Sequence, residues 1–228
     1  MNALLVGCGS KFGLELNKIY QSFGYSVISL GSNPVEGTQN IIIDWNTLSY
    51  DDIVEIAEKL PNLDVIFFNQ KYGSGPENNH FDTRVFNIGD LKRWTQAYWV
   101  NCQMPFCLVN LLKDKILEHT KVGWMLGWGR IDQPINDQNW KKSTYGSMKV
   151  TNLMMMKGFA HTKIGIFYAI YIKSGIDDDR RVETAKTIFE FQEKIKKENN
   201  GQSMFEDGTL FNYYTTPPLP NHKKFTTL

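Results

Sequence analysis

Short, wholly apolar runs alternate along this chain of 228 residues with longer stretches whose apolar side chains recur at helical spacing. Apolar runs without polar alternation are typical of strands covered on both faces of a parallel sheet. The alternation therefore predicts an α/β fold with a doubly wound parallel sheet of about seven strands and helices on both faces. The expected strands are Ala3–Val6, Ser26–Leu30, Ile41–Ile43, Val65–Phe68, Val122–Leu126, Ile164–Ile172 and Ser203–Phe205. The expected helices are Phe12–Phe23, Asp51–Leu60, Asp90–Glu118, Thr144–Thr162 and Arg181–Glu198.

Composition excludes several classes of protein. Lys and Arg number 25 against 24 Asp and Glu, which gives no general electrostatic case for binding nucleic acid or an anionic membrane. Three cysteines and four histidines share no zinc-ligand spacing, so no metal site is expected. No apolar run approaches the roughly 20 residues that span a bilayer, and the N-terminus lacks the basic region of a signal peptide. We expect a soluble, cytoplasmic protein.

The chain shows no linker and no internal repeat. One domain over residues 1–216 is therefore the better count than two, followed by a proline-containing tail over residues 217–228.

A glycine-rich turn lies between the first strand and the first helix. Gly7, Gly9 and Gly13 follow the spacing G-x-G-x-x-x-G. Glycines there permit a tight turn and let a pyrophosphate approach the backbone, and the helix N-terminus offers unpaired amides to phosphates. A merely structural turn is the alternative, since turn glycines are frequent. We favour a nucleotide-binding function.

The end of the second strand indicates which nicotinamide dinucleotide would bind. A carboxylate there would favour NAD, but the chain has Gly31-Ser32 instead. Lys11, with the hydroxyls of Ser10 and Ser32, could meet a 2′-phosphate, although Lys11 could equally be one more solvated lysine. The sequence favours NADP, with NAD possible.

Tyr145 and Lys149 stand four residues apart at the start of the helix that follows the fifth strand. Residues at this spacing share a helical face. An ammonium beside a phenol stabilises the phenolate and lowers its pKa towards the range useful for proton transfer. The pair lies at the sheet edge where ligands bind in such folds, so it is a candidate catalytic pair.

Together these pieces resemble the short-chain dehydrogenase/reductase family, over nearly the whole length and in the family's order. The resemblance implies a Rossmann-type fold. The matching pieces are the Gly7–Gly13 turn, Asp44 after the third strand, Asp64–Asn69 at the Asn-Asn-Ala-Gly strand end, Val100-Asn101 in the long helix, Tyr145-x-x-x-Lys149, Lys173–Gly175 and Asn200–Gly208.

The resemblance also implies roles by position. Tyr145 would be the general acid/base, Lys149 would lower its pKa and hold the nicotinamide ribose, and Asn101 would anchor a water-linked proton relay to Lys149. The implied reaction is hydride transfer between NADP or NAD and a carbonyl or alcohol substrate, and the long helices would pair in a homodimer or homotetramer. The residues that would contact the dinucleotide are Gly7, Gly9, Ser10, Lys11, Phe12, Gly13, Ser32, Asp44, Asn69, Tyr145 and Lys149.

The chain departs from the family where a serine usually follows the fifth strand. Trp124–Gly129 carries no hydroxyl group, and the usual spacing lands on Asp132. One explanation is an enzyme in which Asp132, an indole N–H of Trp128 or Trp140, or a backbone amide orients an unusual small-molecule substrate. The other is a catalytically impaired dinucleotide-binding or regulatory protein. A third class is an interaction module without a cofactor. Tyr145, Lys149 and Asn101 together favour the enzyme.

Overall fold

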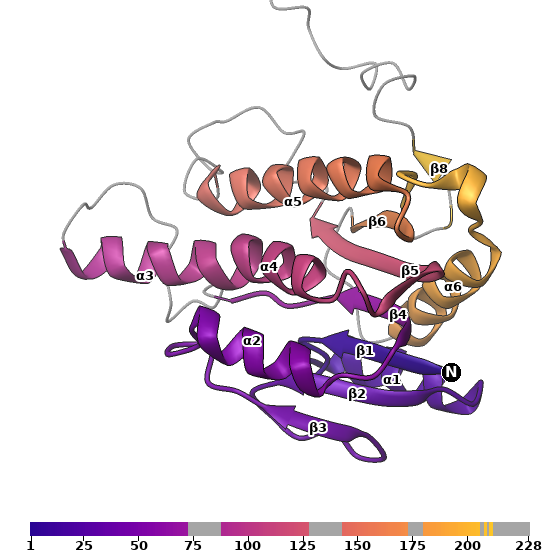
Figure 1. The fold of residues 1–228 in the computed structure, drawn as a ribbon, viewed down its shortest axis with the longest axis horizontal. Coiled ribbons are helices and arrows are strands. Elements are labelled where there is room, and N and C mark those ends of the chain that lie inside the picture. The colour runs from indigo at the N-terminus through magenta and orange to yellow at the C-terminus, as the bar shows by residue number, and fades with distance from the viewer. Residues whose placement is uncertain (73–87, 128–142, 173–179, 206–207, 209, 212–228) are drawn as a thin grey trace, which may run out of the picture.

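In the computed structural model, residues 1–72, 88–127, 143–172, 180–205, 208 and 210–211 are described (Figure 1). Within these ranges, eight strands form one sheet in the order β3-β2-β1-β4-β5-β6-β7-β8, parallel except for the β7–β8 pair. The strands are β1 (Asn2–Val6), β2 (Ser26–Gly31), β3 (Gln39–Ile42), β4 (Leu63–Phe68), β5 (Ile116–Gly127), β6 (Ile166–Ile172), β7 (Ser203–Phe205) and β8 (Leu210–Phe211). The α-helices are α1 (Lys11–Ser22), α2 (Tyr50–Lys59), α3 (Ile88–Tyr98), α4 (Met104–Leu111), α5 (Ser143–Thr162) and α6 (Arg181–Lys194). A π-helical turn, Trp99–Gln103, joins α3 to α4, and a 3₁₀ turn, Lys197–Asn199, follows α6.

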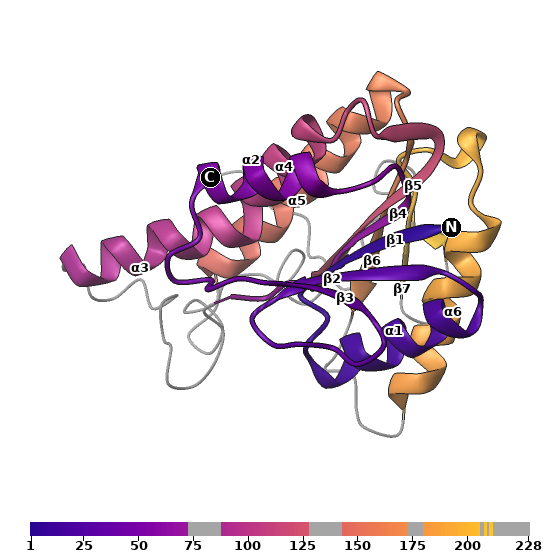
Figure 2. The same cartoon turned by 60° about the horizontal axis from the view of Figure 1, so that its bottom comes forward.

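Helices cover both faces of the sheet. Figure 2 shows α2, α4 and α5 on one side and α1 and α6 on the other. Neighbouring residues of β1 pack on opposite faces of the sheet. Leu4 belongs to the apolar cluster under α2, α4 and α5, and Leu5 belongs to the cluster under α1 and α6. Both are fully buried, as the unalternating apolar runs predict. No helix within the described ranges is long and apolar enough to cross a membrane.

The ends of α1 and α2 follow from local sequence. The Ser10 hydroxyl accepts a hydrogen bond from the Gly13 N–H at 3.1 Å and caps the start of α1. Ser49 and Asp52 form a capping box at the start of α2. At its other end, Lys115 Nζ donates to three carbonyls, those of Ala57 at 2.6 Å and Glu58 at 2.9 Å in the last turn of α2 and that of the C-cap residue Leu60 at 2.5 Å. A lysine from a distant segment thus caps the C-terminus of α2.

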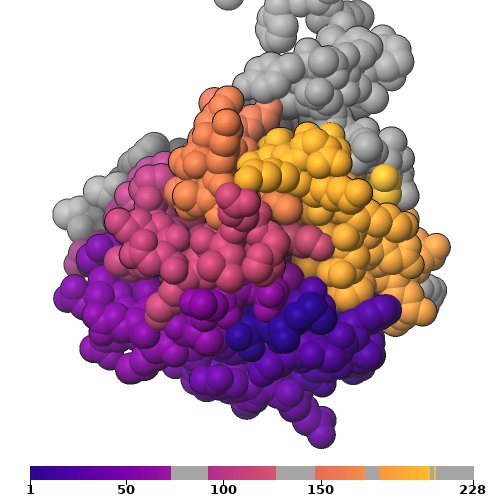
Figure 3. Space-filling model, turned by 45° about the vertical axis from the view of Figure 1, so that its right-hand side comes forward, coloured from indigo at the N-terminus to yellow at the C-terminus, as the bar shows by residue number. Residues whose placement is uncertain are grey.

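The first and last parts of the chain meet in three dimensions. α1 and α6 pack side by side, and the ring of Tyr20 on α1 stands edge-on to that of Phe189 on α6, with centroids 5.1 Å apart. Figure 3 shows N-terminal residues in indigo beside C-terminal residues in yellow. The Asn200 side chain joins this region to the sheet, since it accepts from Phe167 N at 2.7 Å and donates to the carbonyls of Ala160 and Gly165.

The expected helix Asp90–Glu118 ends too late. α3 begins at Ile88, close to the expected start, and a π-turn lies directly before α4, in which Pro105 is the second residue. α4 ends at Leu111, seven residues before Glu118. Residues after Leu111 turn and enter β5, where Ile116 pairs with Leu63 of β4. Pairing with a neighbouring strand outweighs the helical pattern of this segment.

Two further differences concern the edges of the sheet. The connection from β2 to β3, residues 32–38, contains no helix, although parallel neighbours are usually joined through one. The side chain of Asn40 shapes it, because Oδ1 accepts from Val35 N at 2.7 Å and Nδ2 donates to Val35 O at 3.0 Å. At the opposite edge, the antiparallel pair of β7 with β8 was not predicted.

Candidate functional site

In the turn after β1, the fold requires glycine at two of the three glycine positions. Gly7 has φ +75°, and a Cβ there would lie 2.5 Å from Gln70 Cα. A Cβ on Gly13 would lie 2.5 Å from Cys8 Cα and 2.7 Å from the Cys8 carbonyl oxygen. Both contacts are with backbone, which cannot move aside cheaply. These two glycines therefore allow strand, turn and helix to pack closely.

Gly9 is different. A Cβ there would meet nothing nearer than Asn33 Cβ at 3.5 Å, an ordinary contact, and its φ lies outside the region that favours glycine. Gly9, Ser10 and Lys11 are exposed around the N-terminus of α1, whose first turn carries no acidic residue. This end of α1 combines helix amides, a hydroxyl and a cation, which is a suitable arrangement for a phosphate. Phe12 is only 9% exposed and packs in the core, so it can offer a ligand its backbone alone.

The segment Asn69–Tyr72, directly after β4, links the parts of the site. Asn69 Nδ2 donates to Gly7 O at 3.2 Å and to Ser10 Oγ at 3.4 Å, so the end of β4 is tied to the glycine turn. Tyr72 pairs through its backbone with the side chain of Asn101: Tyr72 N donates to Oδ1, and Asn101 Nδ2 donates to Tyr72 O, both at 3.0 Å. Only Asn69 of this segment was predicted, and position after β4 is the signal that could have found Tyr72.

Asp44 lies in the turn that follows β3. Its Oδ1 accepts from the backbone N–H of Asn46 at 2.9 Å and from Asn46 Nδ2 at 2.8 Å, and these hydrogen bonds hold the pKa of the Asp44 carboxyl below its usual value. The Tyr72 hydroxyl donates to Asn46 Oδ1 at 2.6 Å, so the turn is connected to the segment after β4. Burial, followed by the nearby Asp44 charge, raises the pKa of the Tyr72 phenol. Ser32 is exposed just beyond the end of β2.

Asn101 and Lys149 are both buried, with 0% and 4% of their surface exposed. Asn101 lies in the π-turn, and besides its bonds to Tyr72 its Nδ2 donates to Ala97 O at 2.8 Å. Lys149 lies on α5, and its ammonium donates to the carbonyl of Met125 in β5 at 3.1 Å. The backbone of α5 places Tyr145 one turn before Lys149, as predicted, while the Tyr145 side chain lies outside the described residues.

Cys102, beside Asn101, also faces this interior. Burial raises the pKa of its thiol to about 12, with the nearby Lys149 ammonium acting in the opposite direction. Its Sγ lies 3.3 Å from the Met148 carbonyl on α5. A thiol with such a pKa stays protonated at neutral pH, so it is a packing group rather than a nucleophile.

The predicted substrate residues Trp128, Asp132 and Trp140 lie outside the described residues. Trp124, near the end of β5, is 1% exposed and stacks on Phe68 with ring centroids 5.0 Å apart. Trp124 is therefore a core residue and does not line a substrate site. Among the described residues, no three His, Cys, Asp or Glu side chains gather as a metal site would require.

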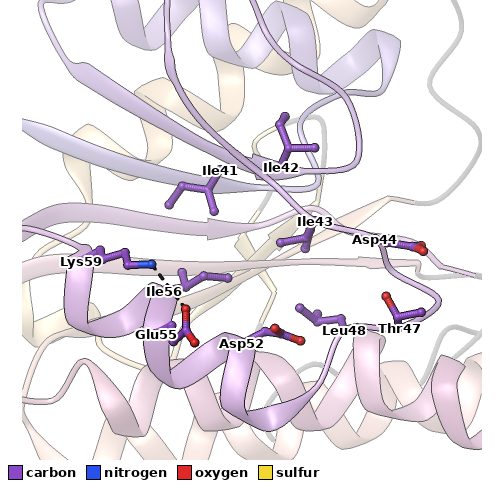
Figure 4. A pocket seen from close by; sticks show the side chains of 10 residues that line it. All are labelled: Ile41, Ile42, Ile43, Asp44, Thr47, Leu48, Asp52, Glu55, Ile56 and Lys59. Carbon is purple, nitrogen blue, oxygen red and sulfur yellow. Dashed lines mark hydrogen bonds and ion pairs between the residues drawn. The ribbon is translucent and has the colours of Figure 1, made fainter.

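A pocket of about 330 Å³ lies between β3 and α2 (Figure 4). Ile41 and Ile43 form part of its apolar wall, and Asp52 and Glu55 stand on the helix opposite. The pocket extends along α2 as far as Lys59. It shares only Asp44 with the predicted dinucleotide-binding residues, so it is not the site described above.

Comparison with known proteins gives the fold and no close relative. No family model matches the chain, and no curated protein matches it. Among solved structures, a Brucella ovis oxidoreductase of the short chain dehydrogenase/reductase family, in complex with a partially ordered NAD, is 16% identical with a TM-score of 0.67, covering 90% of this chain and 97% of that one. A Serratia marcescens short-chain dehydrogenase/reductase variant is 14% identical with a TM-score of 0.70, covering 90% of this chain and 94% of that one. BdcA in complex with NADPH is 13% identical with a TM-score of 0.68, covering 95% of this chain and 98% of that one. With the seven-stranded parallel sheet and its two helical layers, these matches establish that the chain has the Rossmann-type fold of the short-chain dehydrogenases/reductases.

Proposed function

We propose that the protein is an NAD(P)-dependent oxidoreductase that transfers hydride between a nicotinamide dinucleotide and a carbonyl or alcohol. The observation that carries this proposal is the burial of Lys149 one helical turn after Tyr145, at the carboxyl edge of the sheet. Lysine is almost never fully buried without a partner, because its charge must leave water. The Lys149 ammonium is held at the Met125 carbonyl, one helical turn after a tyrosine in the sequence of α5, and this placement calls for a functional explanation.

Each residue has a separate task in the proposed reaction. The dinucleotide supplies or accepts the hydride, and the protein positions it and moves a proton. Tyr145 acts as general acid/base towards the substrate oxygen, and the Lys149 charge stabilises its phenolate. Asn101 holds the segment after β4 through its side chain, which keeps the wall of the site in place.

The N-terminus of α1 fits the phosphates of such a dinucleotide. Gly9 has room for a side chain that the chain does not carry, so contact with a ligand explains this glycine better than internal packing does. Lys11 and Ser32, with no carboxylate at the end of β2, favour NADP over NAD. We expect Lys11→Met to weaken NADPH binding about tenfold and NADH binding little, because only NADPH carries the 2′-phosphate. Equal weakening of both would assign Lys11 to the shared pyrophosphate.

Two measurements test the function. Titration with NADPH and NADH, followed by quenching of tryptophan fluorescence, tests dinucleotide binding, and binding of neither would end the proposal. Turnover on a panel of carbonyl compounds then tests catalysis, with Tyr145→Phe expected to lose at least 100-fold in kcat as the proton donor is removed. Tyr50→Phe, on an exposed residue of α2, is the matched control. Equal turnover by wild type and Tyr145→Phe would remove Tyr145 from the mechanism.

A second candidate is a dinucleotide-binding protein without dehydrogenase activity. The end of β5 favours it, because Trp124 to Gly127 offers no hydroxyl to polarise a substrate carbonyl. Loss of such a donor costs on the order of 10²–10³ in rate. Tight NADPH or NADH binding without turnover on any compound would select this candidate.

We also propose that the protein forms a homodimer or homotetramer through α4 and α5. Large apolar side chains are exposed on these two helices: Phe106 by 44%, Val150 by 39% and Met154 by 58%. Exposed apolar surface of this kind marks an interface in many proteins. Light scattering should give an oligomer for the wild type and a smaller species for Met154→Glu.

A further inference from the structure

Tyr72 joins two parts of the sheet edge that the strand order keeps apart. In the order β3-β2-β1-β4, the chain changes its direction of winding between β1 and β4, and ligands of such sheets bind at the carboxyl ends of the strands beside this reversal. Tyr72 follows β4, on one side of the reversal, and Asn46 follows β3, on the other side. The Tyr72 hydroxyl donates to Asn46 Oδ1 at 2.6 Å, so this hydrogen bond connects the two sides where a ligand is expected.

Both ends of this hydrogen bond are held by other contacts. The backbone of Tyr72 pairs with the fully buried side chain of Asn101, from Tyr72 N to Oδ1 and from Nδ2 to Tyr72 O, both at 3.0 Å. On the other side, Gln96 Nε2 of α3 donates to the carbonyl of Trp45 at 2.7 Å. The phenol therefore spans two anchored segments, the end of β4 and the turn after β3.

The hydrogen bonds around Asn46 run in one direction, from Tyr72 to Asp44. A carboxylate only accepts, so Asn46 turns its Nδ2 to Asp44 Oδ1, at 2.8 Å, and its Oδ1 to the phenol. Burial, followed by the Asp44 charge, raises the pKa of the Tyr72 phenol, which therefore remains a donor at neutral pH. The Tyr72 hydroxyl thus fixes the Asn46 amide, and this amide and the Asn46 backbone N–H together fix the Asp44 carboxylate.

We propose that Tyr72 is a positioning residue for the adenosine half of the dinucleotide: it holds Asn46 and, through Asn46, sets the Asp44 carboxylate to accept a hydrogen bond from the ligand. This inference rests on the proposed function and deepens it. An ionised carboxylate accepts and cannot donate, so the group that it selects is a donor. The adenosine half offers two kinds of donor, the amino group of adenine and the ribose hydroxyls. Tyr72 takes part in neither hydride transfer nor proton transfer, so it acts on binding of the dinucleotide.

The test uses Tyr72→Phe, which removes the hydroxyl and leaves both the ring and the backbone pair with Asn101 in place. Tyr50→Phe is the matched control, because it makes the same change on a tyrosine of α2 that is 51% exposed.

The first readout is hydrogen exchange in the ligand-free protein. The backbone N–H of Asn46 donates to Asp44 Oδ1, and that of Leu48 donates to the Asp44 carbonyl, both at 2.9 Å. We expect both N–H groups to exchange about threefold faster or more in Tyr72→Phe, because the turn opens more easily, and at the wild-type rate in Tyr50→Phe. Unchanged exchange in Tyr72→Phe would show that the hydroxyl does not hold the turn, and it would overturn the inference.

The second readout is the Kd of NADPH, of NADH and of reduced nicotinamide hypoxanthine dinucleotide, in which a carbonyl replaces the amino group of adenine. We expect Tyr72→Phe to raise the Kd of NADPH and NADH about five- to tenfold, with kcat at saturation little changed, because one hydrogen bond to the ligand loses its alignment. A smaller effect on the hypoxanthine dinucleotide would assign the donor to the amino group, and an equal effect would assign it to a ribose hydroxyl. Either result supports the positioning role.

A double-mutant comparison separates positioning through Asp44 from a general structural role. In an Asp44→Ala background, Tyr72→Phe should change the Kd of NADPH by less than about twofold. The same loss of affinity with and without Asp44 would overturn the inference. An unchanged Kd in Tyr72→Phe would overturn the inference alone, since dinucleotide binding would then be established. If the wild type binds neither NADPH nor NADH, the proposed function fails, and this inference fails with it.

Discussion

Replacing Gly9 by aspartate should separate a phosphate-binding turn from a merely structural one. The fold has room for the new side chain, because a Cβ at Gly9 meets its nearest neighbour at 3.5 Å. An acid at the N-terminus of α1 also interacts favourably with the helix dipole, by about 0.3–1 kcal/mol. The free energy of unfolding should therefore stay the same or rise slightly.

Binding of the dinucleotide should weaken strongly in the same variant. A carboxylate at about 6 Å from a phosphate charge repels it by roughly 0.7–3 kcal/mol, for an effective dielectric constant between about 80 and 20. Two phosphate charges double this figure, and about 1.4 kcal/mol corresponds to a tenfold change in Kd. We expect Gly9→Asp to raise the Kd for NADPH and NADH at least tenfold, and more at low salt.

Two companion variants make the comparison decisive. Gly9→Ala adds a side chain without a charge and should bind NADPH and NADH more tightly than Gly9→Asp. Gly13→Ala should instead destabilise the fold by about 1–3 kcal/mol, or about 2–12 °C in Tm, because its Cβ meets Cys8 backbone at 2.5 Å. Fluorescence titration gives the Kd, and thermal unfolding gives the Tm. Wild-type affinity in Gly9→Asp would refute a phosphate site at this turn.

Three other predictions concern stability. Lys115→Met should lower the free energy of unfolding by about 1.5–3 kcal/mol, because it removes the charged cap of α2. Lys113→Met, on the exposed surface, is the control and should change this free energy little. Equal effects of the two variants in urea unfolding would argue against the cap. Asn200→Ala should cost about 2–3 kcal/mol for the hydrogen bonds between α5 and β6, which calorimetry can measure; a loss below about 0.5 kcal/mol would show that water replaces them. Burial raises the pKa values of Cys8 and Cys102 from 9.0 to about 12, so the folded state keeps protons that the unfolded state releases, and stability should fall by about 1.4 kcal/mol per thiol per pH unit above pH 9. The double alanine variant should show a shallower decline between pH 9 and 10, and an unchanged slope would contradict the assignment.

The sequence predicts the sheet and its helical layers because buried strands carry their signal locally. Leu4 and Leu5 must both be apolar, since the two faces are covered, and the same holds for the runs in β4 and β6. The end of α4 could not be predicted in this way. Whether residues after Leu111 continue a helix or enter β5 depends on the pairing of Ile116 with Leu63, and sequence periodicity does not contain that contact.

In the candidate site, too, the residues with a local sequence signal could be predicted and those that depend on a distant contact could not. Gly7, Gly13 and Lys149 stand at recognisable spacings, and each lies where the spacing placed it. Asn152 was not predicted: it is buried on α5 and its Nδ2 donates to the Asn101 carbonyl at 2.8 Å, but an asparagine in a long helix carries no signal until its partner is known. That partner is a backbone carbonyl, which every residue carries, so the sequence does not single it out.

The short connection between β2 and β3 has a dynamic consequence. β3 is four residues long and no crossover helix covers it, so Ile42 is 54% exposed and few buried contacts oppose its opening. Segments with so few buried contacts open locally at a lower free energy than the core does. Asp44 lies two residues after the end of β3, so local opening of this outer strand would also move that part of the site. The residence time of a ligand held at Asp44 would then depend on how often this edge of the sheet opens, and not on the rigid centre of the sheet.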